Sequence, residues 1–322
     1  MEIDHLHELV SEDLKAVNAL MIEKIKSPVE LMENAAKHAL QSGGKRLRPL
    51  LVLLTSHACN NQGRDHIKLA AMIEFFHTAT LLHDDVIDEA TLRRGRETTN
   101  YLWGNKVSIL VGDYLFTKYL QLMVDVGDID IIELLVDIAP QMGNGEVQEL
   151  SNRQNINLTM SEYFDTIRAK TSLLFAAAAS IGAIISNADN TVEKSLYTYG
   201  LHLGNAFQLT DDALDYCSDA KTLGKNIGTD LADGKITLPL LYALKFGTEN
   251  QQIKIKQSIE LGTLDYLPEI LDAMANTKAI EYTHDLAATE VDLAISALQV
   301  LPDSTYKNAL EDLAKYVVHR NY

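Results

Sequence analysis

The 322-residue sequence is poor in residues that interrupt helices or cross-link a chain. It contains 6 prolines, 17 glycines and two cysteines, and no low-complexity tract divides it. No apolar run approaches the ~20 residues that a membrane-spanning helix needs, so no span is expected. The polar, acidic residues 1–14 do not form a signal peptide pattern. We therefore expect one continuous domain over residues 1–322.

Cysteine usage and charge exclude further classes. Cys59 and Cys217 lie in apolar helical stretches without the spacing of a metal site or redox motif. They are expected to be reduced core residues, as is typical of a cytoplasmic protein. The formal net charge of −17 argues against a nucleic-acid partner and against electrostatic attachment to anionic lipid.

Apolar residues make up 47% of the chain and recur with helical spacing nearly throughout, whereas strand patterns are almost absent. A first helix is expected to begin at Leu50, after Pro49. Further helices are expected over residues 70–88, 107–123, 129–149, 161–185, 191–216, 238–246, 269–274, 280–298 and 306–318. Because residues 175–183 are apolar on most faces, they are expected at the centre of the fold. The pattern predicts an all-α helical bundle with room for a central cavity.

One acidic pattern, an aspartate pair followed by a third aspartate, occurs twice in apolar surroundings. Its members are Asp84, Asp85 and Asp88 in the first cluster and Asp211, Asp212 and Asp215 in the second. In each cluster the first and last aspartates, four residues apart, share a helix face. A single cluster could be a solvated helix end. Two matched clusters predict one site with two acidic walls.

The chemistry of these clusters points to a hard cation. Carboxylates so close together repel one another unless a cation lies between them. The donors are all oxygens, with no histidine or cysteine at ligand spacing. This donor set favours Mg²⁺, with Mn²⁺ as an alternative, over Zn²⁺. Magnesium commonly bridges carboxylates to substrate phosphates.

Basic residues are concentrated near the acidic clusters and near glycines. They are Lys45, Arg48, Arg93, Arg94, Lys170, Lys225 and Lys235. Each could be a solvated surface charge, but together they predict two diphosphate pockets, because arginine and lysine bind phosphate oxygens. No P-loop, dinucleotide fingerprint or nucleophile elbow is present, so a nucleotide substrate is not supported.

These motifs resemble the polyprenyl synthetase (trans-isoprenyl diphosphate synthase) family over about residues 14–318, and within it the bacterial octaprenyl class. The motifs that carry the resemblance are residues 43–49, 84–88 with 93–95, 170–171, 207–208, 211–215 and 224–225. The resemblance implies an isoprenoid-synthase-type helical bundle. One aspartate motif alone would be a weak signal, because terpene cyclases also have it.

The resemblance also implies a role for each motif residue. Mg²⁺ is assigned to Asp84, Asp88 and Asp211, supported by Asp85, Asp212 and Asp215. The allylic diphosphate is assigned to Arg93, Lys170 and Lys225, with Lys235 as a loop contact. Isopentenyl diphosphate is assigned to Lys45, Arg48, His77 and Arg94. Thr171 and Gln208 are placed along the reacting carbons. By itself His77 reads as a core histidine, but it lies two turns before Asp84 on the same face.

The implied function is that of a prenyltransferase supplying side chains for quinones such as ubiquinone. It condenses isopentenyl diphosphate units onto an allylic diphosphate such as farnesyl diphosphate, by ionisation, condensation and elimination. The small residues Ala79 and Thr80, one turn before Asp84, favour a long product around the octaprenyl class, and Met123 is a candidate for the tunnel floor. The family further implies a homodimer, with residues 107–123 as a contact, and a transient membrane encounter at product release.

Two other readings remain open. A terpene cyclase or a head-to-head squalene-type synthase shares the broad fold, but the second acidic cluster and the segment 43–49 fit neither well. A non-catalytic subunit of a heteromeric prenyl synthase belongs to a different class. Such subunits usually lose an acidic motif, and both motifs are intact here.

Overall fold

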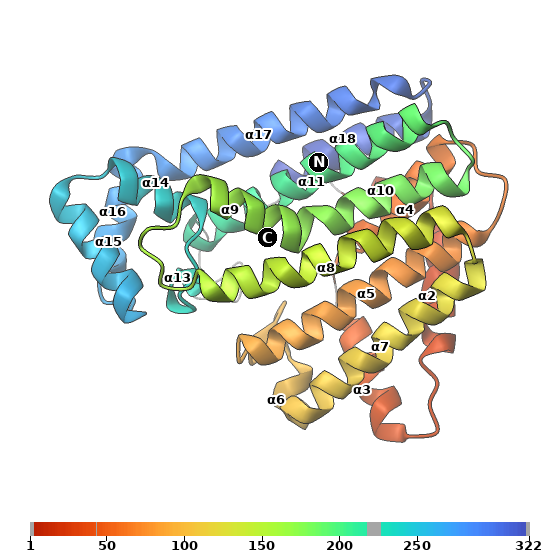
Figure 1. The fold of residues 1–322 in the computed structure, drawn as a ribbon, viewed down its shortest axis with the longest axis horizontal. Coiled ribbons are helices and arrows are strands. Elements are labelled where there is room, and N and C mark those ends of the chain that lie inside the picture. Colours follow the sequence, from red (N-terminus) through yellow and green to blue (C-terminus); the bar gives the residue numbers. More distant parts are fainter. Residues whose placement is uncertain (1–2, 43, 218–226, 320–322) are drawn as a thin grey trace.

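The computed structural model describes residues 3–42, 44–217 and 227–319, which form helices packed side by side around an apolar centre (Figure 1). The N-terminal helices are α1 (Asp4–Leu9), α2 (Ser11–Lys24), α3 (Glu30–Gln41), α4 (Leu47–Ala58) and α5 (Asp65–Ile87). The next elements are strands β1 (Leu92–Arg93) and β2 (Arg96–Glu97) and helices α6 (Thr99–Trp103), α7 (Asn105–Val126) and α8 (Ile129–Ser151). The all-α class expected from periodicity is confirmed, and the described strands are limited to this antiparallel pair.

The second half of the chain completes the bundle and adds a smaller group of helices beside it. It begins with α9 (Met160–Ile167), the π-helix η1 (Arg168–Ser172), α10 (Leu173–Ile185) and α11 (Asn190–Cys217). It ends with α13 (Thr229–Ala232), α14 (Leu238–Phe246), α15 (Glu249–Leu261), α16 (Leu267–Thr277), α17 (Ala279–Ala297), the 3₁₀ turn η2 (Leu298–Val300) and α18 (Thr305–His319). Helices α14 to α16 lie together at one end of the molecule (Figure 1).

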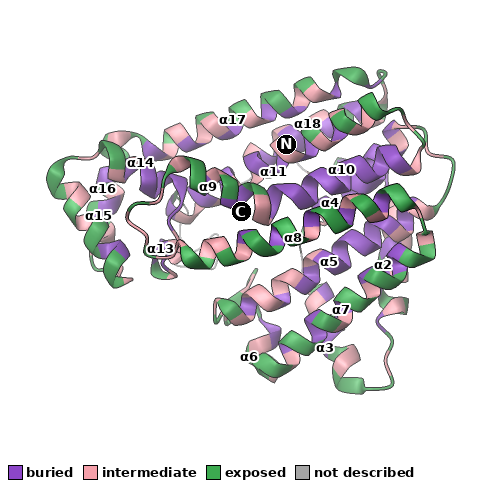
Figure 2. Ribbon diagram, viewed as in Figure 1, coloured by how far each residue is buried: buried purple, intermediate pink, exposed green. Residues whose placement is uncertain are grey.

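Helix α10 lies at the centre of the bundle. Residues 173–184 are all buried, and α10 contacts α4, α5, α8 and α11 (Figure 2). This confirms the central position predicted for the alanine-rich segment. A second apolar core lies under α14 to α17. Helices α11 and α17 contribute to both cores, so they join the two parts of the fold.

Two glycines allow the elements that carry the site to approach closely. A Cβ on Gly204 of α11 would lie 2.5 Å from the Cα of Ser172, and one on Gly145 of α8 would lie 2.7 Å from the Cβ of Ala169. Both contacts are with η1. This π-turn is therefore packed between α8 and α11, each of which has a glycine at the contact point. A π-turn inside a long helix re-aims the residues it carries, here Lys170 and Thr171.

The structure corrects several helix boundaries. Helix α4 begins at Leu47, so Pro49 is its third residue and does not precede it; proline is tolerated there because first-turn amides have no partner within the helix. The helix expected over residues 161–185 is divided by η1. Helices α2, α3 and α15 had not been expected, because their composition is more polar.

The cysteine prediction is wrong for one residue. Cys59 is half-buried, whereas Cys217, the last residue of α11, is exposed. An apolar neighbourhood in the sequence did not reveal that the helix ends there.

By length and composition, the described helices at residues 105–126 and 160–185 could each cross a membrane. In the best window of the second, 83% of the residues are buried inside the bundle, as expected of a core helix. In the first, α7, the share is 39%. Five large apolar residues of α7 are exposed, namely Ile109, Leu110, Phe116, Leu120 and Val124.

Candidate active site

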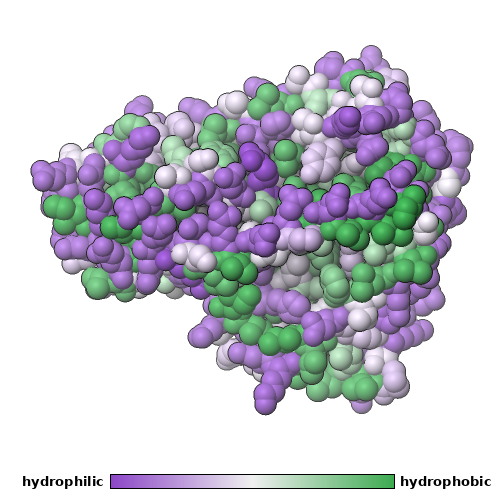
Figure 3. Space-filling model, in the orientation of Figure 1, coloured by the Kyte–Doolittle hydropathy of each residue, from purple (hydrophilic) through white to green (hydrophobic). Residues whose placement is uncertain are grey.

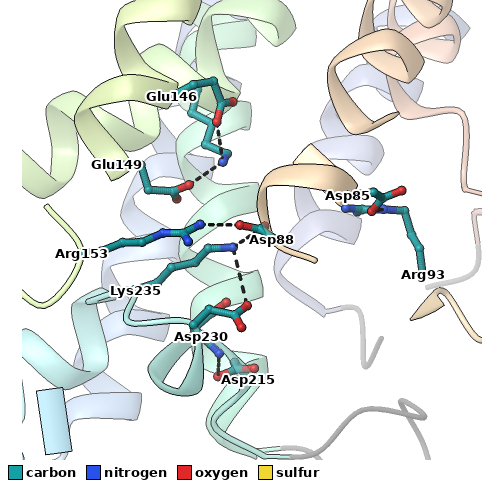
Figure 4. A network of polar contacts seen from close by, with 11 residues as sticks. Asp85, Asp88, Arg93, Glu146, Glu149, Arg153, Asp215, Asp230 and Lys235 are labelled. Carbon is teal, nitrogen blue, oxygen red and sulfur yellow. Dashed lines mark hydrogen bonds and ion pairs between the residues drawn. The ribbon is translucent and has the colours of Figure 1, made fainter. Parts of the chain in front are cut away.

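The first aspartate cluster lies at the C-terminal end of α5, opposite α8, α11 and the segment that follows α13 (Figure 4). Asp88 forms ion pairs with two cations from these elements. Arg153 donates to Oδ1 of Asp88, and Nζ of Lys235 lies 2.8 Å from Oδ2. Burial alone would raise the pKa of Asp88, but the two cations outweigh it and lower that pKa below its ordinary value. This aspartate is therefore held as a carboxylate.

Asp84 and Asp85 occupy different environments. Asp85 is buried and accepts a hydrogen bond of 2.7 Å from Nε of Arg93. Within the described residues the carboxylate of Asp84 accepts no hydrogen bond, and its backbone carbonyl accepts one of 2.8 Å from the amide of Asp88. Burial raises the pKa of Asp84, and the charges of Lys170 and Arg93 offset only part of that effect. Asp84 is thus a partly desolvated carboxylate that an added cation would stabilise.

The second cluster has mostly neutral partners. Asp212 is buried and accepts hydrogen bonds from the hydroxyl of Tyr163 and from Nε2 of Gln208, the latter at 2.7 Å. Burial, with the nearby charge of Asp230, raises the pKa of Asp212 well above its ordinary value. Asp215 accepts a hydrogen bond of 3.2 Å from the backbone amide of Asp230, which ties α13 to α11.

The two clusters belong to one site. Lys235 is paired with Asp88 of the first cluster and is also influenced by the charge of Asp230, which is bonded to Asp215 of the second. Asp211 interacts electrostatically with Arg48 and with Arg94, which follows the first cluster. The two clusters are therefore connected through Lys235 and Asp230, and the single cleft between two acidic walls stays a prediction.

Lys170 is held between two glutamates of α8. Its Nζ lies 2.7 Å from Glu146 and 2.5 Å from Glu149 (Figure 4). Burial, together with the charge of Asp84, raises the pKa of Glu146 to about 7. Burial would lower the pKa of Lys170, but the charges of Glu149 and Asp84 outweigh it and raise that pKa. The ammonium therefore stays charged at the edge of the acidic cleft.

Thr171 and Gln208, which were expected to lie side by side, are connected by a hydrogen bond. The hydroxyl of Thr171 donates to Oε1 of Gln208 at 2.8 Å, and Gln208 in turn donates to Asp212. A pocket of about 150 Å³, partly open to solvent, lies beside them. Its walls include Lys170, Thr171, Gln208, Asp212 and Lys235.

A separate basic group lies at the start of α4. Nη1 of Arg48 is 3.1 Å from Nε2 of His77, and its guanidinium carbon is 4.3 Å from the ring centre of Phe175. Burial lowers the pKa of Arg48 to about 10, so it remains cationic at neutral pH. Burial, followed by the charge of Arg48, lowers the pKa of His77 well below its ordinary value. His77 is thus a neutral acceptor that orients Arg48.

The remaining basic residues lie near this group or outside the described chain. Arg94 reaches the backbone of Gly44, where an added Cβ would lie 2.3 Å from its Nη1. Nζ of Lys45 lies 5.1 Å from the ring centre of Tyr316 of α18. Lys225 falls outside the described residues.

The chain-length residues stay a prediction. Ala79 and Met123 are buried, and the hydroxyl of Thr80 donates to the carbonyl of His77. Two pockets adjoin the aspartates, and neither is lined by any of these three residues.

Several residues of the site were not anticipated from the sequence. They are Glu146, Glu149, Arg153, Tyr163 and Asp230. Glu146 and Glu149 of α8 are three residues apart and so share one helix face, and Arg153 follows in the turn after that helix. That spacing was a usable signal. Tyr163 and Asp230 had no comparable signal, because their partners are far away in the sequence.

An all-α bundle whose aspartate clusters and basic groups line one cleft defines a protein of the isoprenoid-synthase class. The comparisons agree. The family model "Polyprenyl synthetase" matches residues 29–274. Octaprenyl diphosphate synthase of Escherichia coli is 42% identical over 322 residues, 100% of both chains.

Solved structures show the same likeness. The crystal structure of a decaprenyl diphosphate synthase from Rhodobacter capsulatus is 41% identical, with a TM-score of 0.94 over 100% of both chains. A polyprenyl synthase from Caulobacter crescentus, complexed with calcium and isoprenyl diphosphate, is 38% identical, with a TM-score of 0.96 over 100% of this chain and 98% of the other. The chain belongs to the polyprenyl synthetase family, whose members act on isoprenyl diphosphates and use a divalent metal.

Proposed function

We propose that this chain is a long-chain trans-polyprenyl diphosphate synthase. It joins isopentenyl diphosphate units to an allylic diphosphate such as farnesyl diphosphate, and its product is of the octaprenyl class, for quinone side chains such as that of ubiquinone. The observation that supports this proposal most strongly is that Lys235 and Asp230 connect the two aspartate clusters. The names of the relatives, octaprenyl and decaprenyl synthases, support a long product.

The donor set of the cleft fits Mg²⁺, with Mn²⁺ as an alternative. Asp84, Asp88 and Asp211 would hold the metal, and all three offer hard carboxylate oxygens. The raised pKa of Asp84 fits this assignment, because a bound cation would relieve the cost of its burial. When bound, Mg²⁺ supplies positive charge that stabilises the departing diphosphate.

The chain's own cations would bind the two substrates at separate places. We assign the allylic diphosphate to Arg93, Lys170 and Lys225, with Lys235 at the loop. Lys170 would exchange part of its contact with Glu146 and Glu149 for phosphate oxygens. Because the pKa of Glu146 is raised to about 7, this glutamate can become neutral at little cost when an anion arrives.

Isopentenyl diphosphate is assigned to the basic group of Lys45, Arg48, His77 and Arg94. Arg48 is packed on Phe175 and fixed by His77, so its guanidinium fork is oriented before the substrate arrives. Bound in this way, isopentenyl diphosphate would bring its double bond beside the allylic carbon.

Carbon–carbon bond formation requires that water stay away from the allylic cation. Thr171 and Gln208 present oxygen dipoles toward the reacting carbons, and their mutual hydrogen bond fixes both. The proton lost after condensation passes to the departing diphosphate, so no protein base is required.

The proposal is tested by incubating the purified chain alone with farnesyl diphosphate, labelled isopentenyl diphosphate and Mg²⁺. A long polyprenyl product is expected, and excess EDTA should abolish it until Mg²⁺ is restored. No product until a partner protein is added would instead support a heteromeric subunit. A cyclised hydrocarbon would support a terpene cyclase.

We assign product length to Ala79, Thr80 and Met123, which would line the path of the growing tail. Ala79→Tyr is expected to shorten the product, because a bulky ring one turn below Asp84 would stop the growing tail. Chromatography of the dephosphorylated products measures this. An unchanged length would remove Ala79 from the tunnel wall.

We further propose that the chain is cytoplasmic, folds as one domain over residues 1–322 and forms a homodimer through α7. Exposed apolar residues lie along this helix, among them Leu110 and Val124 at 58% and 71% exposure. Apolar side chains also gather over the region where α7 meets α8 (Figure 3). Size-exclusion chromatography with light scattering tests this, and Leu110→Glu should give the monomer. Transient membrane contact would follow release of an insoluble product.

A further inference from the structure

Two histidines and an aspartate meet at the end of the bundle away from the cleft. Asp13 comes from α2, His57 from the last turn of α4 and His66 from the first turn of α5. His66 and Asp84 are eighteen positions apart in α5, so the two sites are about 27 Å apart along the helix. None of the three residues has a role in the proposed reaction.

The three side chains direct one ligand atom each toward a common point. Nε2 of His57 lies 2.6 Å from Oδ2 of Asp13, and Nε2 of His66 lies 3.5 Å from the same oxygen. All three ligand atoms lie within 4.8 Å of one another. Neighbouring ligands of a tetrahedral zinc ion, each about 2.0–2.1 Å from the metal, are about 3.3 Å apart. The distance from His66 to Asp13 is close to this value. Nε2 of His57 would need to move away from Oδ2 of Asp13 by less than about 1 Å.

His66 provides an independent observation. Its side chain is 7% exposed, and its Nε2, directed at Asp13, is a buried polar atom without a hydrogen-bond partner in the described structure. A buried polar group left in this way normally costs stability, so it calls for an explanation.

We propose that Asp13, His57 and His66 form a structural zinc site that fastens α2 to the turn between α4 and α5. Two imidazoles and one carboxylate favour Zn²⁺ over Mg²⁺, so this site and the catalytic cleft select different metals. The side chains of His57 and Asp13 are 27% and 19% exposed, which admits a water as fourth ligand. His57 also stacks on Tyr306 of α18, with ring centres 4.7 Å apart, which limits its movement.

Asn61, in the turn, is placed to orient His66. Its Nδ2 lies 3.0 Å from Nδ1 of His66, and its Oδ1 accepts from the amide of Gly63 at 3.1 Å. For Nε2 to bind a metal, Nδ1 must carry the proton and donate it to an oxygen. Rotation of the Asn61 side-chain amide by 180° would turn its Oδ1 toward Nδ1 of His66 and away from the amide of Gly63. An aspartate at this position has two carboxylate oxygens, so it could accept from Nδ1 of His66 and from the amide of Gly63 at the same time.

The test is zinc binding by isothermal titration calorimetry with saturating Mg²⁺ present, so that the catalytic aspartates are already occupied. One Zn²⁺ per chain is expected for the wild type. His57→Gln, His66→Gln and Asp13→Asn should each weaken binding at least tenfold. Asn61→Asp should tighten it by about tenfold, the size of a typical effect of a residue that orders a metal ligand. His319→Gln changes an exposed histidine of α18 and is the matched control.

A second readout uses Co²⁺ as a spectroscopic substitute. Nitrogen ligands in tetrahedral geometry should give strong visible absorption bands that the His57→Gln chain lacks, with Mg²⁺ present in both samples. His57 is partly exposed, so its variant should fold even if His66→Gln does not. Zinc binding that is absent in the wild type, or unchanged in His57→Gln and Asp13→Asn, would overturn the site. Prenyltransferase activity does not enter either measurement, so this result is independent of the proposed function.

Discussion

The two aspartate clusters have the same spacing in the sequence but opposite electrostatic environments. On α5, Asp85 and Asp88 are paired with arginine and lysine side chains. On α11, Asp212 is bonded to a phenol and an amide, both neutral. The charges of Asp85 and Asp88 are therefore largely neutralised by the protein itself, whereas the charge of Asp212 depends more on an external cation. Equal spacing in the sequence did not imply equal charge balance in the fold.

The largest expected effect concerns the residue of each wall that is assigned to the metal. Asp84→Asn and Asp211→Asn should each lower kcat by about 10²–10³-fold, the usual loss when one charge-stabilising group is removed. Steady-state assays with labelled isopentenyl diphosphate measure this. Asp292→Asn, at an exposed position on α17, should leave kcat unchanged. If only one of the two aspartates mattered, the cleft would have a single functional wall.

The next effect concerns how each wall is packed. Gly204 of α11 lies against the backbone of Ser172, which cannot move aside. Gly204→Ala should therefore destabilise the protein by about 3 kcal/mol and lower activity by displacing Thr171. On the other wall, Gly112 of α7 meets chiefly the ring of His83, which is 38% exposed and can swing outward.

Gly112→Ala is accordingly the matched control and should cost less than about 1 kcal/mol. Urea unfolding measures both variants. An added Cβ on Gly112 would also approach the backbone of α5. If both variants lost the same free energy of unfolding, the backbone of α5 would be as unable to move aside as that of η1.

Much of this arrangement could be predicted from the sequence, because it depends on local patterns. Helical periodicity placed α5 and α11, and the spacing of the aspartates indicated which face they share. The partners could not be predicted in the same way. Tyr163 and Asp212 are 49 residues apart, and Lys235 and Asp88 are 147 apart. Such pairs depend on how the helices pack.

The π-turn η1 shows the same limit. No residue between Arg168 and Ser172 is unusual for an α-helix, so the extra residue in the turn could not be recognised. What permits the close contacts around it is the absence of side chains at Gly145 and Gly204, on two other helices. The glutamates of α8 were different. Like the aspartates, they are spaced so that they share one helix face. Glutamates with this spacing on a partly exposed helix are also typical of a solvent-facing surface, so the signal was ambiguous.

The smallest expected effect is on the pH dependence of stability, and it should have opposite signs on the two walls of the metal-free protein. The pKa of Asp88 is lowered from 3.8, so its ion pairs stabilise the fold above that pH and the contribution is lost as the pH falls below it. The pKa of Asp212 is raised well above 3.8, so folding favours its protonated form. That contribution is present at low pH and is lost as the pH rises.

Asp88→Asn should thus lower the free energy of unfolding by about 1.5 kcal/mol at neutral pH, and the difference from wild type should close below about pH 4. For Asp212→Asn, wild type should lose stability relative to the variant as the pH rises from 4 toward neutrality, and added Mg²⁺ should reduce that loss. Urea unfolding at a series of pH values, with Asp292→Asn as control, measures both. Parallel profiles for the two variants would show that the neutral partners of Asp212 compensate its charge as well as Arg153 and Lys235 compensate that of Asp88.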